Sequence, residues 1–505
     1  MNERIILTTL NARYTHAALG LRYLYANLGA LKSQTHLLEF TINQNVLEIA
    51  EQLLANKPQI IGLAVYIWNI NECTRVVELL KAIAPEVIIV LGGPEVSYET
   101  EQQAIVTLAD YVITGPGDIS FRELCAKLLQ GQRPSEKIIA GKQVPLSELV
   151  LPYVDYTDED LQHRAIYVEA SRGCPFKCEF CLSSLDETAW PFDLARFLAE
   201  MEQLWQRGLR QFRFVDRTFN LKIATTTAIL DFFFARLDEA TFLHFELIPD
   251  HLPDALKERI SRFPPGSLQF EIGIQTFNPQ VQANISRKQD NAKSAENIRW
   301  LREHSHAHLH TDLIFGLPGE TLDSFAQGFD RLIALNPHEI QVGILKRLRG
   351  TPIIRHTDDF GMIYNPQAPY NILQNQDVGF ATMQAMSRFA RYWDMIGNSG
   401  RFEHTLPLLL GATPFARFWA LSEWIYQQTQ QTHQIALPRL FVLIHQAGQQ
   451  LLALEPAVLE QALVKNYART GQKGQIPFLA EARKNPPLPS NDKTSSRNNR
   501  QLRHL

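Results

Sequence analysis

The stretch Ser171-Arg172-Gly173-Cys174-Pro175-Phe176-Lys177-Cys178-Glu179-Phe180-Cys181 holds three of the five cysteines of the 505-residue chain, in the spacing C-x3-C-x2-C. Thiolates at this spacing can surround one metal centre from a single loop. Strand and helix patterns alternate both before and after the stretch, which predicts two α/β domains with a metal-binding loop where they meet.

The number of cysteines narrows the kind of metal centre. A structural zinc site usually has four ligands in two separated pairs, whereas Cys73 and Cys125 are isolated from the loop and from each other. A 4Fe-4S cluster normally takes four cysteines, so three leave one iron open to another ligand. We interpret Cys174, Cys178 and Cys181 as ligands of such a cluster. The alternatives are a zinc site completed by a histidine and three unligated buried cysteines.

The first region predicts a doubly wound parallel sheet, because five strand-like runs alternate with helical runs. The strands are expected at residues 4–8, 36–40, 59–65, 86–91 and 111–114. Ligands of such sheets bind beyond the carboxyl ends of the strands, where this chain has Tyr66, Gly92, Gly93 and Gly115. Glycines at these places allow a ligand to approach the backbone closely; the alternative is that they only form tight turns.

The second region predicts a partial (βα)6 barrel, although an open sheet has the same periodicity. Its strands are expected at residues 165–170, 211–215, 241–247, 267–274, 307–315 and 338–345. Barrel chemistry takes place at the carboxyl ends of the strands, which are followed here by Asp216, Gln275 and Gly316. The alternatives are a helix N-cap for Asp216, a hydrogen-bonded core amide for Gln275 and a purely structural turn for Gly316.

The expected organisation has three domains, a linker and a tail. They are an α/β domain at 1–140, a linker at 141–164, the barrel at 165–360, a helical domain at 361–483 and a disordered tail at 484–505. The tail is expected to be disordered because it is polar and rich in Pro, Ser and Asn. Aromatic residues at helical spacing in the C-terminal domain are expected to form core.

Composition excludes several classes of protein. With 45% hydrophobic and 20% charged residues and a net charge of −4, the chain is typical of soluble globular proteins, and no pull toward nucleic acid or an anionic membrane is expected. Few cysteines argue against a secreted disulfide framework. No run of about 18 apolar residues predicts a transmembrane helix. We therefore expect a cytoplasmic protein.

The cysteine loop resembles that of the radical S-adenosylmethionine superfamily. Residues 1–360 are similar to the members with a cobalamin-binding domain, and 361–483 to the uncharacterised helical domain of one branch. The motifs are Leu91-Gly92-Gly93-Pro94, Glu271-Ile272-Gly273-Ile274-Gln275-Thr276, Asp312-Leu313-Ile314-Phe315-Gly316-Leu317-Pro318-Gly319-Glu320 and Pro369-Tyr370-Asn371-Ile372-Leu373.

This resemblance implies three cofactors. S-adenosylmethionine would bind the open iron, and its reductive cleavage would yield a 5′-deoxyadenosyl radical. Cobalamin would bind the first domain. The expected reaction is methylation of an unactivated carbon of a small metabolite, with an electron donor such as flavodoxin or ferredoxin. Rearrangement or cyclisation without methylation is the alternative, and an iron–sulfur electron-transfer or redox-sensing protein is the alternative of another class.

The resemblance also suggests roles for individual residues. Asp216, Gln275 and Gly316 are expected near S-adenosylmethionine or substrate, and the sheet-edge residues near cobalamin. No Asp-x-His-x-x-Gly motif supplies an imidazole to cobalt, and His16 is interpreted as a loop or capping residue. Methylthiolation would need three further cysteines in the first domain, which has only Cys73 and Cys125. No catalytic side chain is identified by the motifs.

Overall fold

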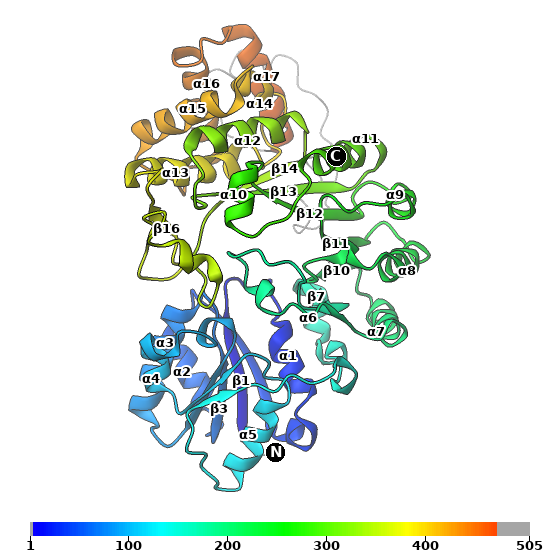
Figure 1. Cartoon of the computed structure of the whole chain (residues 1–505), viewed down its shortest axis with the longest axis vertical. Helices are drawn as coiled ribbons and strands as arrows, with labels where there is room; N and C mark the ends of the chain where they lie inside the picture. Colours follow the sequence, from blue (N-terminus) through cyan, green and yellow to red (C-terminus); the bar gives the residue numbers. More distant parts are fainter. Residues whose placement is uncertain (1–3, 472–505) are drawn as a thin grey trace.

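The computed structural model describes residues 4–471 of the chain. An α/β domain, a strand-and-helix barrel and a helical region follow one another along the long axis of the molecule (Figure 1). The tail predicted at 484–505 lies outside the described residues. Within residues 4–471, no helix combines the length and the apolar character needed to cross a membrane.

The N-terminal domain is a parallel sheet covered by helices on both faces, as predicted (Figure 1). Its strands, in spatial order, are β2 (Thr35–Thr41), β1 (Ile5–Asn11), β3 (Ile60–Ala64), β4 (Ile88–Gly92), β5 (Tyr111–Thr114) and β6 (Ile138–Ala140). Its helices are α1 (Leu19–Ala26), α2 (Val46–Leu54), α3 (Ile70–Ile83), α4 (Ala104–Leu108) and α5 (Ser120–Leu129). The prediction of five strands was wrong, because β6 is a three-residue edge strand too short to show a period.

The segment 141–164, predicted as a linker, carries α6 (Asp158–His163) and is tied to the first domain by buried charges. Arg22 lies 2.9 Å from Glu39 and 2.8 Å from Asp160, and Arg164 contacts the same two carboxylates at 2.6 and 3.0 Å. All four side chains are at least nine-tenths buried. Buried ion pairs require good geometry and specify one arrangement, so this segment is a fixed joint.

The second sheet is a partial barrel of six parallel strands. In spatial order they are β14 (Glu339–Ile344), β13 (His308–Phe315), β12 (Leu268–Gln275), β11 (Phe242–Leu247), β10 (Gln211–Phe214) and β7 (Ile166–Val168). The helices are α7 (Leu194–Gln206), α8 (Ile223–Phe234), α9 (Asp254–Ile260), α10 (Pro279–Asn284), α11 (Asn291–His304) and α12 (Leu322–Ala334).

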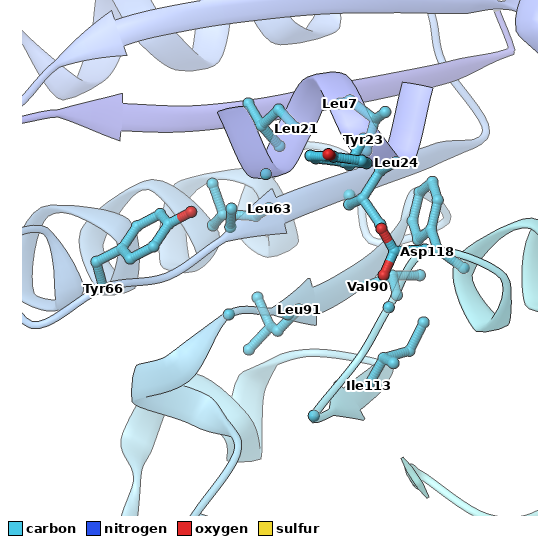
Figure 2. A pocket seen from close by; sticks show the side chains of 18 of the residues that line it. Leu7, Leu21, Tyr23, Leu24, Leu63, Tyr66, Val90, Leu91, Ile113 and Asp118 are labelled. Carbon is cyan, nitrogen blue, oxygen red and sulfur yellow. The ribbon is translucent and has the colours of Figure 1, made fainter. Parts of the chain in front are cut away.

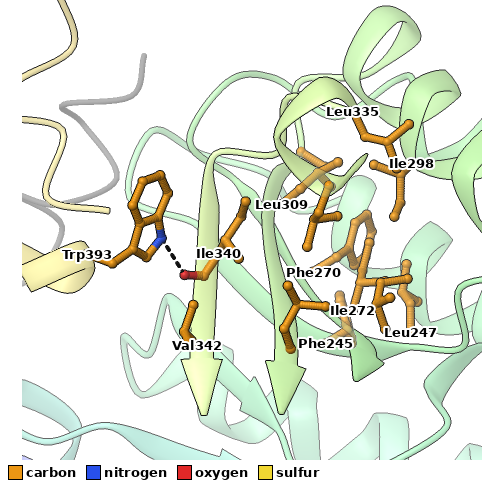
Figure 3. Packing of buried hydrophobic residues seen from close by; sticks show 14 of the residues in the cluster. Phe245, Leu247, Phe270, Ile272, Ile298, Leu309, Leu335, Ile340, Val342 and Trp393 are labelled. Atoms are coloured by element: carbon orange, nitrogen blue, oxygen red, sulfur yellow. Dashed lines mark hydrogen bonds between the residues drawn. The ribbon is translucent and has the colours of Figure 1, made fainter. Parts of the chain in front are cut away.

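Side chains alternate between the two faces along these strands, apart from an irregularity at the end of β12. One face is apolar and packs on the helices: Figure 3 shows Phe245, Phe270 and Leu309 beside Ile298 and Leu335. The intervening residues of the same strands, such as Glu246, Glu271 and Asp312, are polar and line a cavity on the other side. Because successive residues of a strand point to opposite faces, the alternation both builds the core and supplies the cavity.

The C-terminal region closes the open edge of this barrel. It comprises a hairpin, β15 (Ile363–Tyr364) and β16 (Ile372–Gln374), and helices α13 (Phe380–Ile396), α14 (Leu406–Leu410), α15 (Pro414–Thr429), α16 (Leu437–Gln450) and α17 (Pro456–Arg469). Trp393 Nε1 donates to the Ile340 carbonyl at 2.8 Å (Figure 3). The Asn398 amide both donates to that carbonyl and accepts from the Ile340 amide, each at 2.9 Å. Asn398 thus forms with Ile340 the two hydrogen bonds that a neighbouring strand would otherwise form with the edge strand β14.

We expect Asn398→Ala to lower the stability of the protein. The substitution leaves the buried Ile340 amide without its partner, which costs roughly 1–3 kcal/mol. Thermal unfolding of the variant should show a lower midpoint than that of the wild type. The exposed Asn43→Ala is the control and should stay within about 0.5 kcal/mol of the wild type; equal midpoints for both variants would contradict the role of Asn398.

Candidate functional site

The three clustered cysteines lie on one loop at the carboxyl end of β7, the first strand of the barrel. A short antiparallel ribbon of β8 (Ser171–Arg172) and β9 (Trp190–Pro191) closes the base of the loop. Cys174 and Cys178 are buried and Cys181 is partly exposed. All three line a cavity of about 350 Å³ at the carboxyl ends of the barrel strands. Further residues of its wall are Phe176, Arg217, Gln275, Arg287 and Gln341.

One thiol of this loop, that of Cys178, lies beside a positive charge. Burial raises the pKa of Cys178, and the Arg287 guanidinium, 3.4 Å from its sulfur, opposes that rise. No three His, Cys, Asp or Glu side chains within residues 4–471 are grouped for a single metal ion, whereas the cysteines of a 4Fe-4S cluster bind different irons. The cavity wall, as described, includes no histidine to complete a zinc site.

Gln275 enters this cavity from β12 at a strained position. Its φ is +67°, and the pairing register of β12 with β13 shifts between Gly273 and Gln275. A Cβ on Gly273 would meet the Gln275 amide nitrogen, so a larger residue there would displace this side chain from its present position. Gln275 Oε1 is buried and has no hydrogen-bond partner in the described chain. Backbone strain and a buried acceptor without a hydrogen-bond partner are both typical of ligand-binding sites.

Three carboxylates on neighbouring strands line one wall of the cavity. Glu246 accepts a hydrogen bond from Arg217 at 2.8 Å, and Glu271 lies 3.0 Å from His244. Although burial opposes it, the hydrogen bond and charge of His244 lower the pKa of Glu271 to about 2. Burial, followed by the charges of Glu271 and Glu246, raises the pKa of Asp312 well above its usual value. The wall therefore combines an ionised carboxylate, Glu271, with a carboxyl group, Asp312, that favours its protonated form.

Asp216 does not line the cavity that the cysteines share. Its buried carboxylate accepts hydrogen bonds from the Ala170 amide at 3.0 Å and the Ser171 hydroxyl at 2.6 Å. The N-cap alternative does not apply either, because α8 begins at Ile223 after Lys222. Asp216 anchors the start of the cysteine loop, and its neighbour Arg217 reaches the cavity instead.

The stability of the iron-free protein should depend on pH through Asp216. Burial raises the pKa of this carboxyl to about 7, against 3.8 ordinarily, despite its hydrogen bonds from the loop. Between about pH 4 and about pH 7, the carboxyl group is protonated in the folded chain and ionised in the unfolded chain. The free energy of unfolding therefore falls as the pH rises from about 4 to about 7. The difference in thermal midpoint between Asp216→Asn and the wild type should therefore rise over that range. Parallel profiles for the two proteins would refute this.

Gly316 lies at the turn after β13 with φ +92° and faces the C-terminal region instead of the cavity. A Cβ at this position would lie 2.6 Å from Ile372 Cγ2 and 3.3 Å from Met383 Cε. The absence of a side chain allows the hairpin and α13 to pack against the turn. The structural alternative is therefore favoured over a cofactor contact for this residue.

A second cavity, of about 200 Å³, lies at the carboxyl edge of the N-terminal sheet. All four residues expected there, Tyr66, Gly92, Gly93 and Gly115, line it. Figure 2 shows leucine and isoleucine side chains directed into the same space, among them Leu21, Leu63, Leu91 and Ile113. Gly115 has φ +70° and only open space where a Cβ would be, so a ligand can approach the backbone there.

Arg172 ties the base of the cysteine loop to the first domain, and the sequence patterns did not identify it. It stands two residues before Cys174 and its side chain lines the cavity of the N-terminal domain. Its guanidinium lies 3.1 Å from Asp118 and 2.8 Å from Glu169, and 4.2 Å from the centre of the Tyr23 ring. The base of the cysteine loop is thereby held against the first domain.

His16, Cys73 and Cys125 of the first domain line neither cavity. His16 Nδ1 lies 2.7 Å from the Tyr167 hydroxyl, in the contact between the first domain and β7. Cys73 and Cys125 are fully buried on opposite faces of the sheet, in two separate hydrophobic clusters. As predicted, they act as small hydrophobic residues.

Three family models match successive parts of the chain: the B12 binding domain at 5–125, the radical SAM superfamily at 168–332, and the protein of unknown function DUF4080 at 358–504. The chain is a radical S-adenosylmethionine protein with a B12-binding domain. The predicted family is confirmed, including its branch. The predicted cofactors are likewise supported by one domain of each kind in a single chain.

One curated relative of this radical S-adenosylmethionine protein has a name that combines the same two cofactors. The cobalamin-dependent radical SAM methyltransferase TokK of Streptomyces tokunonensis is 25% identical over 340 residues, covering 59% of this chain and 49% of that protein. The chain thus spans about half the length of the curated relatives it matches.

Two solved structures share its fold. The cobalamin-dependent S-adenosylmethionine radical enzyme OxsB, with aqua-cobalamin bound, has a TM-score of 0.62 at 15% identity, covering 93% of this chain and 84% of that chain. The methyltransferase TsrM from Kitasatospora setae, with cobalamin and a 4Fe-4S cluster bound, has a TM-score of 0.57 at 17% identity, covering 73% of this chain and 80% of that chain. The predicted fold class is confirmed by these likenesses.

Proposed function

We propose that this protein is an enzyme that uses a 4Fe-4S cluster, S-adenosylmethionine and cobalamin to methylate an unactivated carbon of a small metabolite. The observation that carries the proposal is the pair of cavities in one chain. One holds three cysteines, and the other is lined by glycines and apolar residues. In this proposal cobalamin binds the domain expected at 1–140, and the cluster and S-adenosylmethionine bind the barrel expected at 165–360.

The cysteine-lined cavity fits an iron–sulfur cluster with an open iron. Cys174, Cys178 and Cys181 would hold it, and once bound it supplies the electron that cleaves S-adenosylmethionine. The protein positions that molecule: Arg217 and Arg287 offer donors for a carboxylate, and the unpaired Oε1 of Gln275 offers an acceptor. Phe176 and Phe180 cover the cysteines and exclude water.

The cavity of the N-terminal domain fits the aromatic nucleotide base of cobalamin. Its apolar wall and its volume of about 200 Å³ suit one bicyclic ring, while the larger corrin would lie outside it. Gly92, Gly93 and Gly115 would let the nucleotide approach the backbone. Cobalamin supplies a carrier for a methyl group. His16 is held by Tyr167 and is not assigned as a ligand of cobalt.

Three other functions would also use a cluster on the cysteine loop. A cobalamin-dependent rearrangement or cyclisation would use both cavities without transferring methyl. An electron-transfer or redox-sensing protein would need a fourth ligand for the cluster, and methylthiolation a second cluster. Cys73 and Cys125, buried on separate faces of the first sheet, favour neither of these two.

The proposed reaction consumes low-potential electrons. Its partners would be a small-molecule substrate and a donor such as flavodoxin or ferredoxin in the cytoplasm. Neither a nucleic acid nor a membrane is proposed as a partner, since the net charge of −4 offers no general attraction to phosphate surfaces.

The test is transfer of label from S-adenosylmethionine with an isotopically labelled methyl group. The full chain, purified anaerobically with cobalamin, is incubated with a reductant and an extract of small metabolites, and the products are analysed by mass spectrometry. A metabolite that gains the labelled methyl group supports the proposal. Formation of 5′-deoxyadenosine with an altered but unlabelled metabolite would instead support rearrangement or cyclisation.

A further inference from the structure

Glu179 is a buried carboxylate within the cysteine loop, between Cys178 and Cys181. Its side chain is only 4% exposed, which is rare for glutamate unless it is paired. The carboxylate accepts hydrogen bonds from Arg355, with Nε at 2.8 Å, and from the Ser286 hydroxyl. His356 Nε2 lies 2.9 Å from Oε2, the oxygen that also accepts from Arg355 Nε. All the partners come from outside the loop.

The backbone of Glu179 is held on both sides as well. Its amide donates to the Ile285 carbonyl at 3.1 Å, and its carbonyl accepts from the Ile353 amide at 3.0 Å. Ile353, Arg355 and His356 belong to one short 3-10 helix, Pro352–His356, that follows β14. Three segments that are distant in the sequence therefore meet at the middle of the cysteine loop.

This short helix leads directly into the C-terminal region. The His356 ring packs edge-on against Phe360, whose amide donates to the His356 carbonyl at 3.1 Å. Phe360 in turn lies against the turn at Gly319, 3.3 Å from where a Cβ would stand. The contact thus extends from the cysteine loop to the segment where the domain of unknown function begins.

We propose that Glu179 is a positioning residue for the cluster, held by Arg355 and His356 at the start of the C-terminal region. The proposal rests on the cluster of the proposed function. Ligands keep their geometry through the groups that hold them, and loss of such a group typically weakens metal binding about 10–100-fold. Removing Arg355 would also leave the buried charge of Glu179 without its partner. The position of the loop should therefore respond to substitution of either residue.

The experiment measures how fast an iron chelator removes iron from the anaerobically reconstituted full chain. We expect Glu179→Gln, which keeps the shape of the side chain, to lose iron about tenfold faster than the wild type. Arg355→Met should do the same, and because the Arg355 side chain is 60% exposed, this variant tests the contact without altering a buried residue. The double variant should be no faster than the faster single variant, since both remove one interaction.

Glu187→Gln is the matched control. Glu187 follows the same loop but forms an exposed pair with Lys177 at 3.2 Å, so iron release should equal that of the wild type. Equal release from Glu179→Gln, Arg355→Met and the wild type would overturn the positioning role. A wild type that retains iron but transfers no methyl group would overturn only the proposed reaction, and one that binds no iron would overturn both.

Discussion

A variant with Cys174→Ala, Cys178→Ala and Cys181→Ala will bind no 4Fe-4S cluster and will not cleave S-adenosylmethionine. The three thiols line one cavity, and no other cysteine of the described chain reaches it. The reconstituted wild type should hold about four iron per chain, and the variant close to none. Iron analysis and the formation of 5′-deoxyadenosine with dithionite measure the two effects.

The control for this variant removes the two cysteines that lie elsewhere. Cys73→Ala with Cys125→Ala deletes two buried thiols from the N-terminal domain, far from the loop in sequence and each within its own hydrophobic cluster. We expect this double variant to keep its iron and its cleavage activity. Cleavage of S-adenosylmethionine by the triple variant at the wild-type rate would exclude a cluster on this loop as the catalytic centre.

Gly92→Leu will weaken cobalamin binding by about tenfold to a hundredfold, because a leucine side chain would occupy space in the cavity of the N-terminal domain. Gly92 lines that cavity. It has no positive φ, and a Cβ there would meet nothing closer than the Ile113 carbonyl at 3.8 Å, so the backbone accepts the substitution. Titration of the apoprotein with cobalamin, followed by its visible absorption, gives the affinity.

The same substitution at an exposed glycine is the control. It shows whether weaker binding comes from filling the cavity or from a general loss of folded structure. Gly379 lies before α13, has open space around the position of a Cβ and no positive φ. Gly379→Leu should bind cobalamin like the wild type. If Gly92→Leu binds cobalamin with unchanged affinity while its fold is intact, the cavity of the first domain is not where cobalamin is held.

Local sequence patterns were sufficient to predict the position of a residue wherever that position depends on residues nearby in the sequence. The spacing of Cys174, Cys178 and Cys181 predicted their convergence, because one loop can bring three thiols together without help from the rest of the chain. Tyr66 and the glycines after β4 and β5 were placed at one cavity by the rule that parallel strands share a carboxyl edge. Gln275 reached the barrel cavity for the same reason.

Roles that depend on distant partners were not predictable. Asp216 follows a barrel strand as a cofactor-binding residue would, but its carboxylate is used by Ala170 and Ser171, far back in the sequence. Gly316 lies in a ligand-like turn, but the side chains that occupy its open side come from the C-terminal region. Neither periodicity nor motif spacing contains these contacts.

The sequence by itself determined the two α/β domains, the cysteine loop and the edges of the sheets at which ligands would bind. Those features follow from side-chain alternation, turn residues and short spacings, which are local properties of the chain. Only the tertiary structure decided that Arg172 ties the cysteine loop to the first domain, that Glu179 pairs with Arg355, and that the C-terminal region covers the edge of β14. The contacts of Arg172 with Asp118, of Glu179 with Arg355 and of Ile340 with Asn398 join residues 54, 176 and 58 positions apart. Only folding brings such groups within the short range of a hydrogen bond.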